Sequence, residues 1–166
     1  MSITSKNFIF LRTTSDGEEL EYNDSDTWSE SNSANFHWNE NSVQLPAAGY
    51  YGVTSGRHTI AITLNNFVGR ISVQASLANN PTENDWFDIK FCDSGLDYIE
   101  FTDSQVYNPL QNAMVAEQGS TGTFAETVIG NFTYLRVCIS RDYIATVPDE
   151  NQKRVVGKIA QALINF

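Results

Sequence analysis

The segment His58-Thr59-Ile60-Ala61-Ile62-Thr63-Leu64, followed after Asn65-Asn66 by Arg70-Ile71-Ser72-Val73-Gln74-Ala75-Ser76-Leu77, decides the fold class of this chain. Apolar and polar side chains alternate in both segments, and successive side chains of a β-strand point to opposite faces. The residues predicted to face inward are Ile60, Ile62 and Leu64 in the first segment and Ile71, Val73, Ala75 and Leu77 in the second. We predict two adjacent antiparallel strands whose apolar faces belong to one core.

Four further segments show strand patterns and are bounded by Gly, Asn, Asp or Pro residues, which favour turns. These predicted strands cover residues 86–91, 98–101, 124–129 and 134–139. We expect the first two to pair as a hairpin, because the loop between them contains a glycine. An Asn-Phe pair precedes both the strand near residue 71 and the strand near residue 135. This echo suggests two similarly built core strands, one in each sheet of a sandwich.

The remaining parts of the chain are less regular. Residues 13–41 are mostly polar, and we expect loops and short edge strands there. The apolar residues between Val155 and Phe166 fit a helical stripe, but Ile159, Gln161 and Leu163 also alternate as in a strand. We favour a strand because Gly157 weakens a helix, and a short amphipathic helix is the alternative.

The predicted elements together indicate a fold class. About eight short strands separated by turns are typical of sandwiches and jelly rolls. The chain has 166 residues, of which 41% are hydrophobic and 12% aromatic, enough for one core. We therefore predict an all-β fold, a single antiparallel β-sandwich of jelly-roll-like form, with residues 1–166 as one domain.

The charge of the chain is strongly acidic and unevenly distributed. A net charge of −10 argues against binding nucleic acid, because phosphate binding requires local positive charge. No Lys or Arg lies between Arg12 and Arg57. The candidate acidic interface in this stretch consists of Asp16, Glu18, Glu19, Glu21, Asp24 and Asp26. These carboxylates suit contacts with basic surfaces of neighbouring copies, and the alternative is a solvated face that maintains solubility.

Cysteine usage and segment hydropathy indicate the compartment. No apolar run approaches the length of a membrane span, and the first residues lack the order of a secretion signal. We expect synthesis in a cytoplasm and no membrane association. Cys92 and Cys138 lie among strand-forming residues, and we interpret both as small buried thiols rather than as disulfide or metal ligands.

The chain lacks the motifs of the main enzyme classes, so we predict no catalytic activity and no cofactor. His37 and His58 are the only histidines, and we interpret them as surface or strand-edge residues. The carboxylates around Asp24 and Asp26 depart from the spacing of the EF-hand calcium loop, so no metal is predicted.

The aromatic residues offer a possible binding site. Trp28, Trp38 and Trp86 are the candidates for contact with a glycan or a partner protein, because an exposed indole supplies a stacking face. The alternative is that these tryptophans belong to the core. Glu83, Asp85 and Asp88 surround Trp86 and resemble a glycosidase carboxylate pair, but in so acidic a chain we attribute their proximity to chance.

Five segments share a pattern that is more specific than composition, and they cover roughly the middle half of the chain: 49–52, 58–64, 66–77, 81–89 and 130–137. This pattern resembles virion structural proteins of tailed bacteriophages, most closely those of phages that infect cyanobacteria and other marine bacteria. The resemblance implies a small β domain and transfers no catalytic residue. The residues before Asn41 and the segment 104–122 do not contribute to it.

The resemblance implies a virion component, either a head decoration or a neck, tail or fibre-attachment subunit, which acts through subunit contacts. Its expected partners are other virion proteins, and it is expected to form homo-oligomers or to occur in many copies on a particle after synthesis in the host cytoplasm. The alternative function is a carbohydrate-binding module that recognises a glycan on the host surface.

Overall fold

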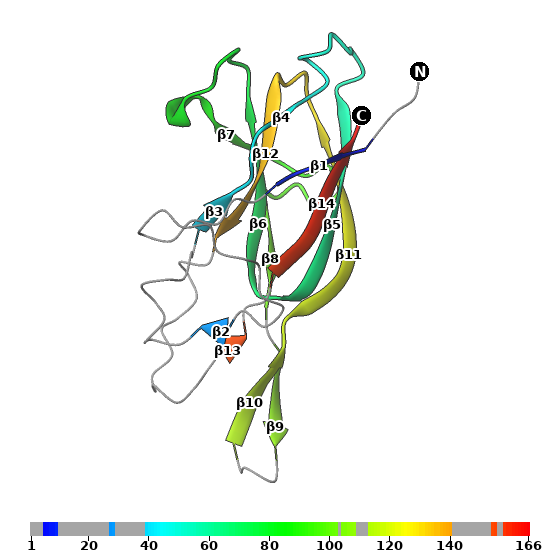
Figure 1. Cartoon of the computed structure of the whole chain (residues 1–166). Helices are drawn as coiled ribbons and strands as arrows, with labels where there is room; N and C mark the ends of the chain where they lie inside the picture. Colours follow the sequence, from blue (N-terminus) through cyan, green and yellow to red (C-terminus); the bar gives the residue numbers. More distant parts are fainter. Residues whose placement is uncertain are drawn as a thin grey trace.

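The computed structural model describes residues 5–9, 27–28, 39–102, 104–108, 113–140, 154–155 and 158–166 (Figure 1). Among these residues the elements are β-strands apart from a short 3₁₀ turn, η2 (Glu83–Asp85). No helix in the described part of the chain is long and apolar enough to cross a membrane.

The first sheet has the strand order β1-β14-β5-β11, and all of its pairs are antiparallel. Its strands are β1 (Lys6–Asn7), β14 (Lys158–Asn165), β5 (Arg57–Phe67) and β11 (Ser120–Ile129). The long strand β5 lies at the centre, because β11 and β14 pair with its two sides along most of its length.

The second sheet has the order β3-β12-β6-β7. These strands are β3 (Asn39–Asn41), β12 (Tyr134–Ser140), β6 (Gly69–Ser76) and β7 (Phe87–Ile89). Two more short strands share its edges, since β4 (Leu45–Pro46) also pairs with β12 and β8 (Tyr98–Phe101) also pairs with β6. Two small ladders lie outside both sheets and join β2 (Thr27–Trp28) to β13 (Arg154–Val155) and β9 (Ser104–Asn108) to β10 (Ala113–Gln118).

The connectivity of the two sheets is that of a jelly roll. Counting β3 with β4, and β7 with β8, as one position each gives eight positions in chain order. The first sheet then reads 1-8-3-6 and the second reads 2-7-4-5. This interleaving of two Greek keys defines the jelly roll, and it confirms the predicted fold class.

The core lies between the two sheets, as the alternation predicted. Ile60, Ile62 and Leu64 of β5 are buried, and so are Ile71 and Val73 of β6. The predicted side-by-side pairing of β5 and β6 is wrong, however, because the two strands belong to different sheets and share the core across the sandwich. Alternation places apolar groups on one face of a strand but does not select the neighbour of that strand.

The turn between β5 and β6 carries the chain from one sheet to the other. Gly69 has a φ of 151°, which side chains with a Cβ rarely adopt, and it directly follows the buried Val68. At the far end of β6 the strand stops at Ser76, so Leu77 is 62% exposed although the alternation predicted it to face inward.

The other strand predictions were correct in position but not always in pairing. β7 and β8 do not form a hairpin, because each pairs with a different part of β6. They form two pieces of one edge position, interrupted by a loop in which Phe91 N–H donates to the carbonyl of Leu96 at 2.9 Å. The two strands introduced by Asn-Phe, β6 and β12, are neighbours in the same sheet rather than members of different sheets.

The C-terminal segment is a strand, as favoured from the sequence. A β-bulge between Ile159 and Gln161 shifts the register by one residue, so Ala162 and Ile164 are buried after Ile159 rather than Gln161 and Leu163. This shift explains why the sequence there fitted both a helix and a strand.

The two cysteines differ in environment, and the prediction of two buried thiols is wrong for Cys92. Cys92 is exposed in the turn after β7, whereas Cys138 is buried on β12. Burial raises the pKa of the Cys138 thiol to about 11.

We expect a thiol reagent such as iodoacetamide to label Cys92 at neutral pH and to leave Cys138 unmodified until the chain unfolds, because the reagent attacks the thiolate. Peptide mass spectrometry of the labelled native and urea-unfolded protein measures this difference. Equal labelling of both cysteines in the native protein would contradict the burial of Cys138.

Candidate binding surface at the loop end

Three loops meet at one end of the sandwich, the upper end in Figure 1. They cover residues 47–56, 77–86 and 130–133. Backbone hydrogen bonds join them, since Gly49 N–H donates to the carbonyl of Phe132 at 2.8 Å and Thr133 N–H donates to that of Ser76 at 3.0 Å. Two of these loops are in close contact at Gly49, where a Cβ would lie 2.6 Å from the Phe132 carbonyl oxygen. This end of the molecule is therefore a tightly packed unit.

Aromatic side chains form a continuous series of contacts around this end. Ring centroids lie 5.6 Å apart for Tyr134 and Tyr50, 5.1 Å for Tyr50 and Tyr51, and 5.8 Å for Tyr51 and Phe166. The series continues through His58 and Phe132 to Phe87, with centroid distances of 5.5, 5.9 and 6.2 Å. Such edge and offset contacts between rings fix their orientations relative to one another.

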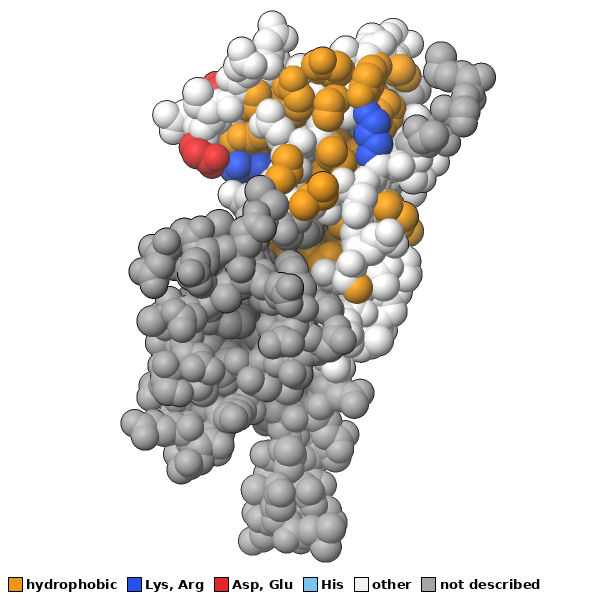
Figure 2. Space-filling view, viewed as in Figure 1, with side chains coloured by type: hydrophobic (Ala, Val, Ile, Leu, Met, Phe, Trp, Pro, Cys, Tyr) orange, Lys and Arg blue, Asp and Glu red, His pale blue; other side chains and the backbone are white. Residues whose placement is uncertain are grey.

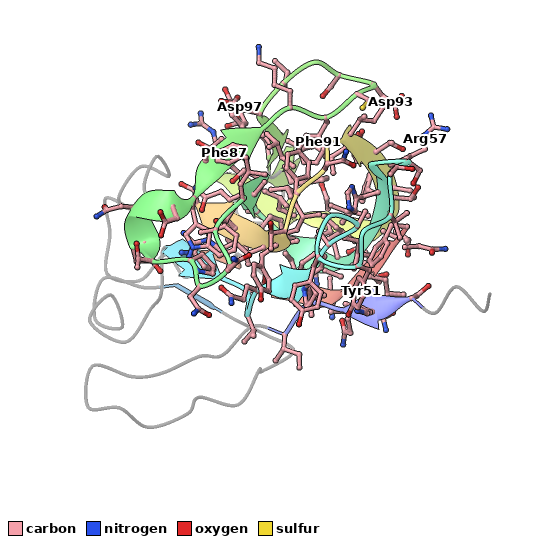
Figure 3. The ribbon with its side chains drawn as sticks, turned by 90° about the horizontal axis from the view of Figure 1, so that it is seen from above. Tyr51, Arg57, Phe87, Phe91, Asp93 and Asp97 are labelled. Atoms are coloured by element: carbon pink, nitrogen blue, oxygen red, sulfur yellow. The ribbon has the colours of Figure 1, made fainter. Side chains whose placement is uncertain are left out.

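Part of this series faces the solvent. Tyr50 is 53% exposed, Tyr51 50% and Phe87 42%. Together with the partly buried Tyr134, they are called here the loop-end aromatic surface. Figure 2 shows hydrophobic side chains gathered over this upper part of the described molecule. Viewed from above, Tyr51 and Phe87 lie on different sides of the loop end, so the surface extends across it (Figure 3).

The charges around the loop-end aromatic surface differ from those of the chain as a whole. Residues 45–56 and 130–134 contain no Asp or Glu, although the chain carries a net charge of −10. The ammonium group of Lys6 lies 4.2 Å from the centroid of the Tyr51 ring and donates a hydrogen bond to the Tyr51 hydroxyl. Asp93 and Asp97 lie on the side of the loop end away from Tyr51 (Figure 3). The carboxylates of the loop end, Glu83 and Asp85, belong to the loop 77–86. A neutral or anionic partner can therefore approach Tyr50 and Tyr51 over the loops 47–56 and 130–133, which carry no carboxylate.

A buried histidine supports the loop end from below. His58 is completely buried on β5, and its Nε2 accepts a hydrogen bond of 3.1 Å from Ala48 N–H. This bond requires an unprotonated Nε2 and places the proton of the neutral ring on Nδ1. Burial lowers the pKa of His58 below its ordinary value, and the nearby carbonyls of Gly56 and Val128 oppose this shift only in part. The interpretation of His58 as a surface or strand-edge residue is therefore wrong.

Trp86 belongs to a different arrangement at the side of the loop end. The guanidinium carbon of Arg136 lies 4.4 Å from the centroid of a Trp86 ring. Arg136 is only 8% exposed, and it donates to both carboxylate oxygens of Glu83 at 3.1 Å and through Nε to the Gln74 side chain at 2.9 Å. One face of the indole is thus occupied by a cation from the same chain. This contact connects the loop 77–86 to β12 of the second sheet.

The carboxylates around Trp86 have structural partners. Glu83 pairs with Arg136, and this hydrogen bond lowers the pKa of Glu83. Asp85 accepts hydrogen bonds of 2.7 Å from both the N–H and the hydroxyl of Thr82, which lower its pKa. Asp88 accepts from the Gln74 side chain at 3.0 Å. Glu83 and Asp85 thus hold the loop in place, and Asp88 joins β7 to β6 through Gln74.

Most of the site residues predicted from the sequence lie outside the region that the structure describes. This applies to Trp38 and to the acidic candidates Asp16, Glu18, Glu19, Glu21, Asp24 and Asp26. Trp28 is described only as part of β2, with Arg154 as its backbone partner. The exposed tyrosines were missed as a site, although Tyr50 and Tyr51 between two glycines indicate a turn, and turns run over the protein surface.

Within the described ranges, no group of three or more His, Cys, Asp or Glu side chains is arranged to hold a metal ion. Comparison of the chain with protein-family models, with curated proteins and with solved structures found no match. The fold, the loop end and the sequence resemblance are therefore the features of this chain that bear on its function.

Proposed function

We propose that this chain is a structural subunit of a tailed-bacteriophage virion and that it binds its neighbours through the loop-end aromatic surface. The observation that carries the proposal is the exposure of Tyr50, Tyr51 and Phe87 together on a tightly packed end of the molecule. A fully buried aromatic side chain removes roughly 150–250 Å² from water, so covering these rings favours association. Tyrosine is also among the residues enriched at protein interfaces.

The fold and the resemblance support the same setting. Jelly rolls occur among viral capsid proteins and among lectins, so the fold by itself is compatible with both assembly and sugar recognition. The resemblance to virion proteins includes residues 49–52, which contain the two exposed tyrosines. We therefore favour a head decoration or a neck, tail or fibre-attachment subunit, present in several copies and made in the host cytoplasm.

Purified virions from infected host cells provide the direct test of this proposal. Mass spectrometry of the particles is expected to detect this chain, and gold-labelled antibodies against it are expected to mark one fixed position on each particle. Particles that lack the chain in both measurements would overturn the proposal.

Glycan recognition on the host surface is the second candidate, and the adjacent tyrosines favour it. Tyr50 and Tyr51 offer ring faces on which a sugar can stack and hydroxyl groups that donate and accept hydrogen bonds. Trp86 is less suited to this role, because Arg136 already covers one of its faces. A sugar-binding role would therefore use the tyrosines rather than the tryptophan.

We expect the double variant Tyr50→Ser/Tyr51→Ser to lose at least about tenfold in affinity for its partner, while its stability falls by less than about 1 kcal/mol. Incorporation into virions and binding to a glycan array are measured in parallel. Loss of incorporation supports the assembly role, and loss of glycan binding supports the second candidate.

The matched control is Tyr98→Ser, because Tyr98 is a 36% exposed tyrosine on β8, in contact with Arg70 rather than with the loop end. This variant is expected to retain both activities. Unchanged binding in the double variant would show that the loop-end aromatic surface is not the contact site.

A further inference from the structure

The outer edge of β11 presents free backbone groups over a short stretch. Thr127 accepts a hydrogen bond of 2.8 Å from Cys92 N–H, so its carbonyl points away from β5. On the other side, Gly130 N–H donates to Gly56 and therefore points toward β5. Because successive residues of a strand alternate in direction, the N–H and C=O groups of Thr123 and Ala125 also point away from β5. No strand in the described part of the chain pairs with them.

This edge has few of the features that protect exposed strands. Thr123, Phe124 and Ala125 are all exposed. Edge strands of soluble proteins usually carry lysine, proline or a bulge that prevents pairing with another chain. Residues 120–125 contain no charged residue and no proline, and the bulge in β11 lies before this stretch, between Ser120 and Gly122.

At the other side of the same sheet, the short strand β1 covers one end of β14. β1 pairs with β14 at Ile164 and Leu163, and Phe8 N–H donates to the carbonyl of Ala162 at 2.8 Å. The upper part of β11 is covered by the loop that contains Cys92. Thr123, Phe124 and Ala125 are therefore the exposed stretch of β11 that precedes the covered Thr127.

We propose that a second copy of this chain adds its own β11 to this edge, antiparallel and related by a two-fold axis that passes near Phe124. In this register Thr123 lies opposite Ala125 of the other copy, and the two residues exchange N–H···O=C hydrogen bonds on both sides of the axis. The pairing is self-complementary, as a two-fold interface requires. It rests on the proposed function, for which it specifies one of the subunit contacts.

The side chains and the charges at this edge fit a second copy. Phe124 is 40% exposed, and its ring centroid lies 5.0 Å from that of Phe101. In the proposed register it faces Phe124 of the other copy in a non-hydrogen-bonded pair, in which side chains approach most closely. Two chains with a net charge of −10 repel each other, and the uncharged residues 120–125 offer a place where they can meet with little opposition.

Disulfide trapping tests both the contact and its register. All variants carry Cys92→Ser, because the exposed native thiol would otherwise form cross-links. Phe124→Cys is expected to form a disulfide-linked dimer under mild oxidation, because the two residues 124 lie directly opposite each other. The matched control is Ala61→Cys, since Ala61 pairs with Ala125 but lies on β5, one strand farther from the axis. The two copies of residue 61 would be about 16 Å apart, too far for a disulfide.

A proline provides the second, independent test. Ala125→Pro removes an N–H that points away from β5, so the sheet of the single chain keeps its hydrogen bonds while the contact with the second copy loses a donor. Circular dichroism is expected to remain unchanged. Sedimentation is measured at about 100 μM, because a contact of modest affinity requires a high concentration. We expect dimers for the native sequence and monomers for Ala125→Pro.

Three results would overturn the inference. They are equal cross-linking of the variants at residues 61 and 124, a native dimer that persists in Ala125→Pro, and a native chain that remains monomeric and fails to cross-link at residue 124. The presence of the chain in purified virions is measured separately. Virions that contain the chain without the β11 contact would refute this inference alone, and a β11 dimer that is absent from virions would refute only the proposed function.

Discussion

Replacing His58 with alanine is expected to lower the free energy of unfolding by about 3 kcal/mol. His58 is completely buried, and its removal leaves a cavity between the rings of Phe132 and Phe166. The variant also leaves Ala48 N–H without its acceptor, and an unsatisfied buried donor is costly. Urea unfolding of the native and variant chains measures the difference.

His58→Gln is the matched variant, because the glutamine side-chain oxygen can replace Nε2 as the acceptor. We expect it to recover at least half of the stability that His58→Ala loses. If glutamine and alanine destabilise the chain equally, the hydrogen bond to Ala48 contributes little and the cavity accounts for the loss.

The same histidine is expected to make stability depend on pH. Burial lowers the pKa of His58 in the folded chain below its ordinary value of 6.5, so the unfolded chain binds the proton more readily. The stability from the neutral ring is therefore fully present well above pH 6.5 and declines as the pH falls through 6.5 toward the lower folded pKa. Protonation also removes the acceptor that Ala48 uses.

Urea unfolding at pH 7.5 and pH 5.5 measures this dependence. The native chain is expected to lose more stability between these values than His58→Gln, which cannot titrate in this range. Other groups that titrate contribute equally to both chains, so the difference between the chains isolates His58. Identical losses in the two chains would contradict a neutral, buried His58.

The sequence was sufficient to predict the strands and the core because both depend on local alternation. Ile60 and Ile71 are buried as predicted. Strand neighbours were not predictable in the same way, since β5 and β6 are consecutive but belong to different sheets. The turn at Val68 and Gly69 directs β6 into the second sheet, and a hydrophobic pattern does not predict the geometry of that turn.

The candidate site was harder to predict, because exposure depends on where strands end. Tyr50 and Tyr51 are half-exposed, and the rings that they contact belong to Tyr134 at the start of β12 and to the C-terminal Phe166, both distant in the sequence. His58 has the same parity as the buried Ile60 and Ile62, so the alternation itself places its side chain on the inward face, where Ala48 of the loop 47–56 bonds to it. The prediction of Trp86 as a glycan or partner contact stays a prediction, and its contact with Arg136 could not be predicted because the two residues lie fifty positions apart in the sequence.

Replacing Arg136 with alanine is expected to destabilise the chain by about 3 kcal/mol and to release the segment that contains η2. The guanidinium of Arg136 joins Glu83, Gln74 and Trp86 on the outer face of the second sheet, so one substitution removes all of these contacts. Urea unfolding measures the stability, and hydrogen exchange of the Asp85 amide measures the release, because this amide donates to Thr82 within the turn.

Two matched variants separate the contributions of Arg136. Arg136→Met keeps most of the aliphatic packing against Trp86 and is expected to lose about half as much stability as Arg136→Ala. Glu83→Gln is expected to cost less than about 1 kcal/mol, because the Glu83 side chain is 80% exposed and its ion pair is screened by water.

If Glu83→Gln destabilises the chain as much as Arg136→Ala, the ion pair holds the segment that contains η2. If Arg136→Ala strongly destabilises the chain and Glu83→Gln does not, the segment is held by the stacking of the guanidinium on Trp86 and by the burial of the Arg136 side chain on β12. In the second case Trp86 is a residue of the scaffold, and the tyrosines at the loop end are the aromatic side chains left for a partner.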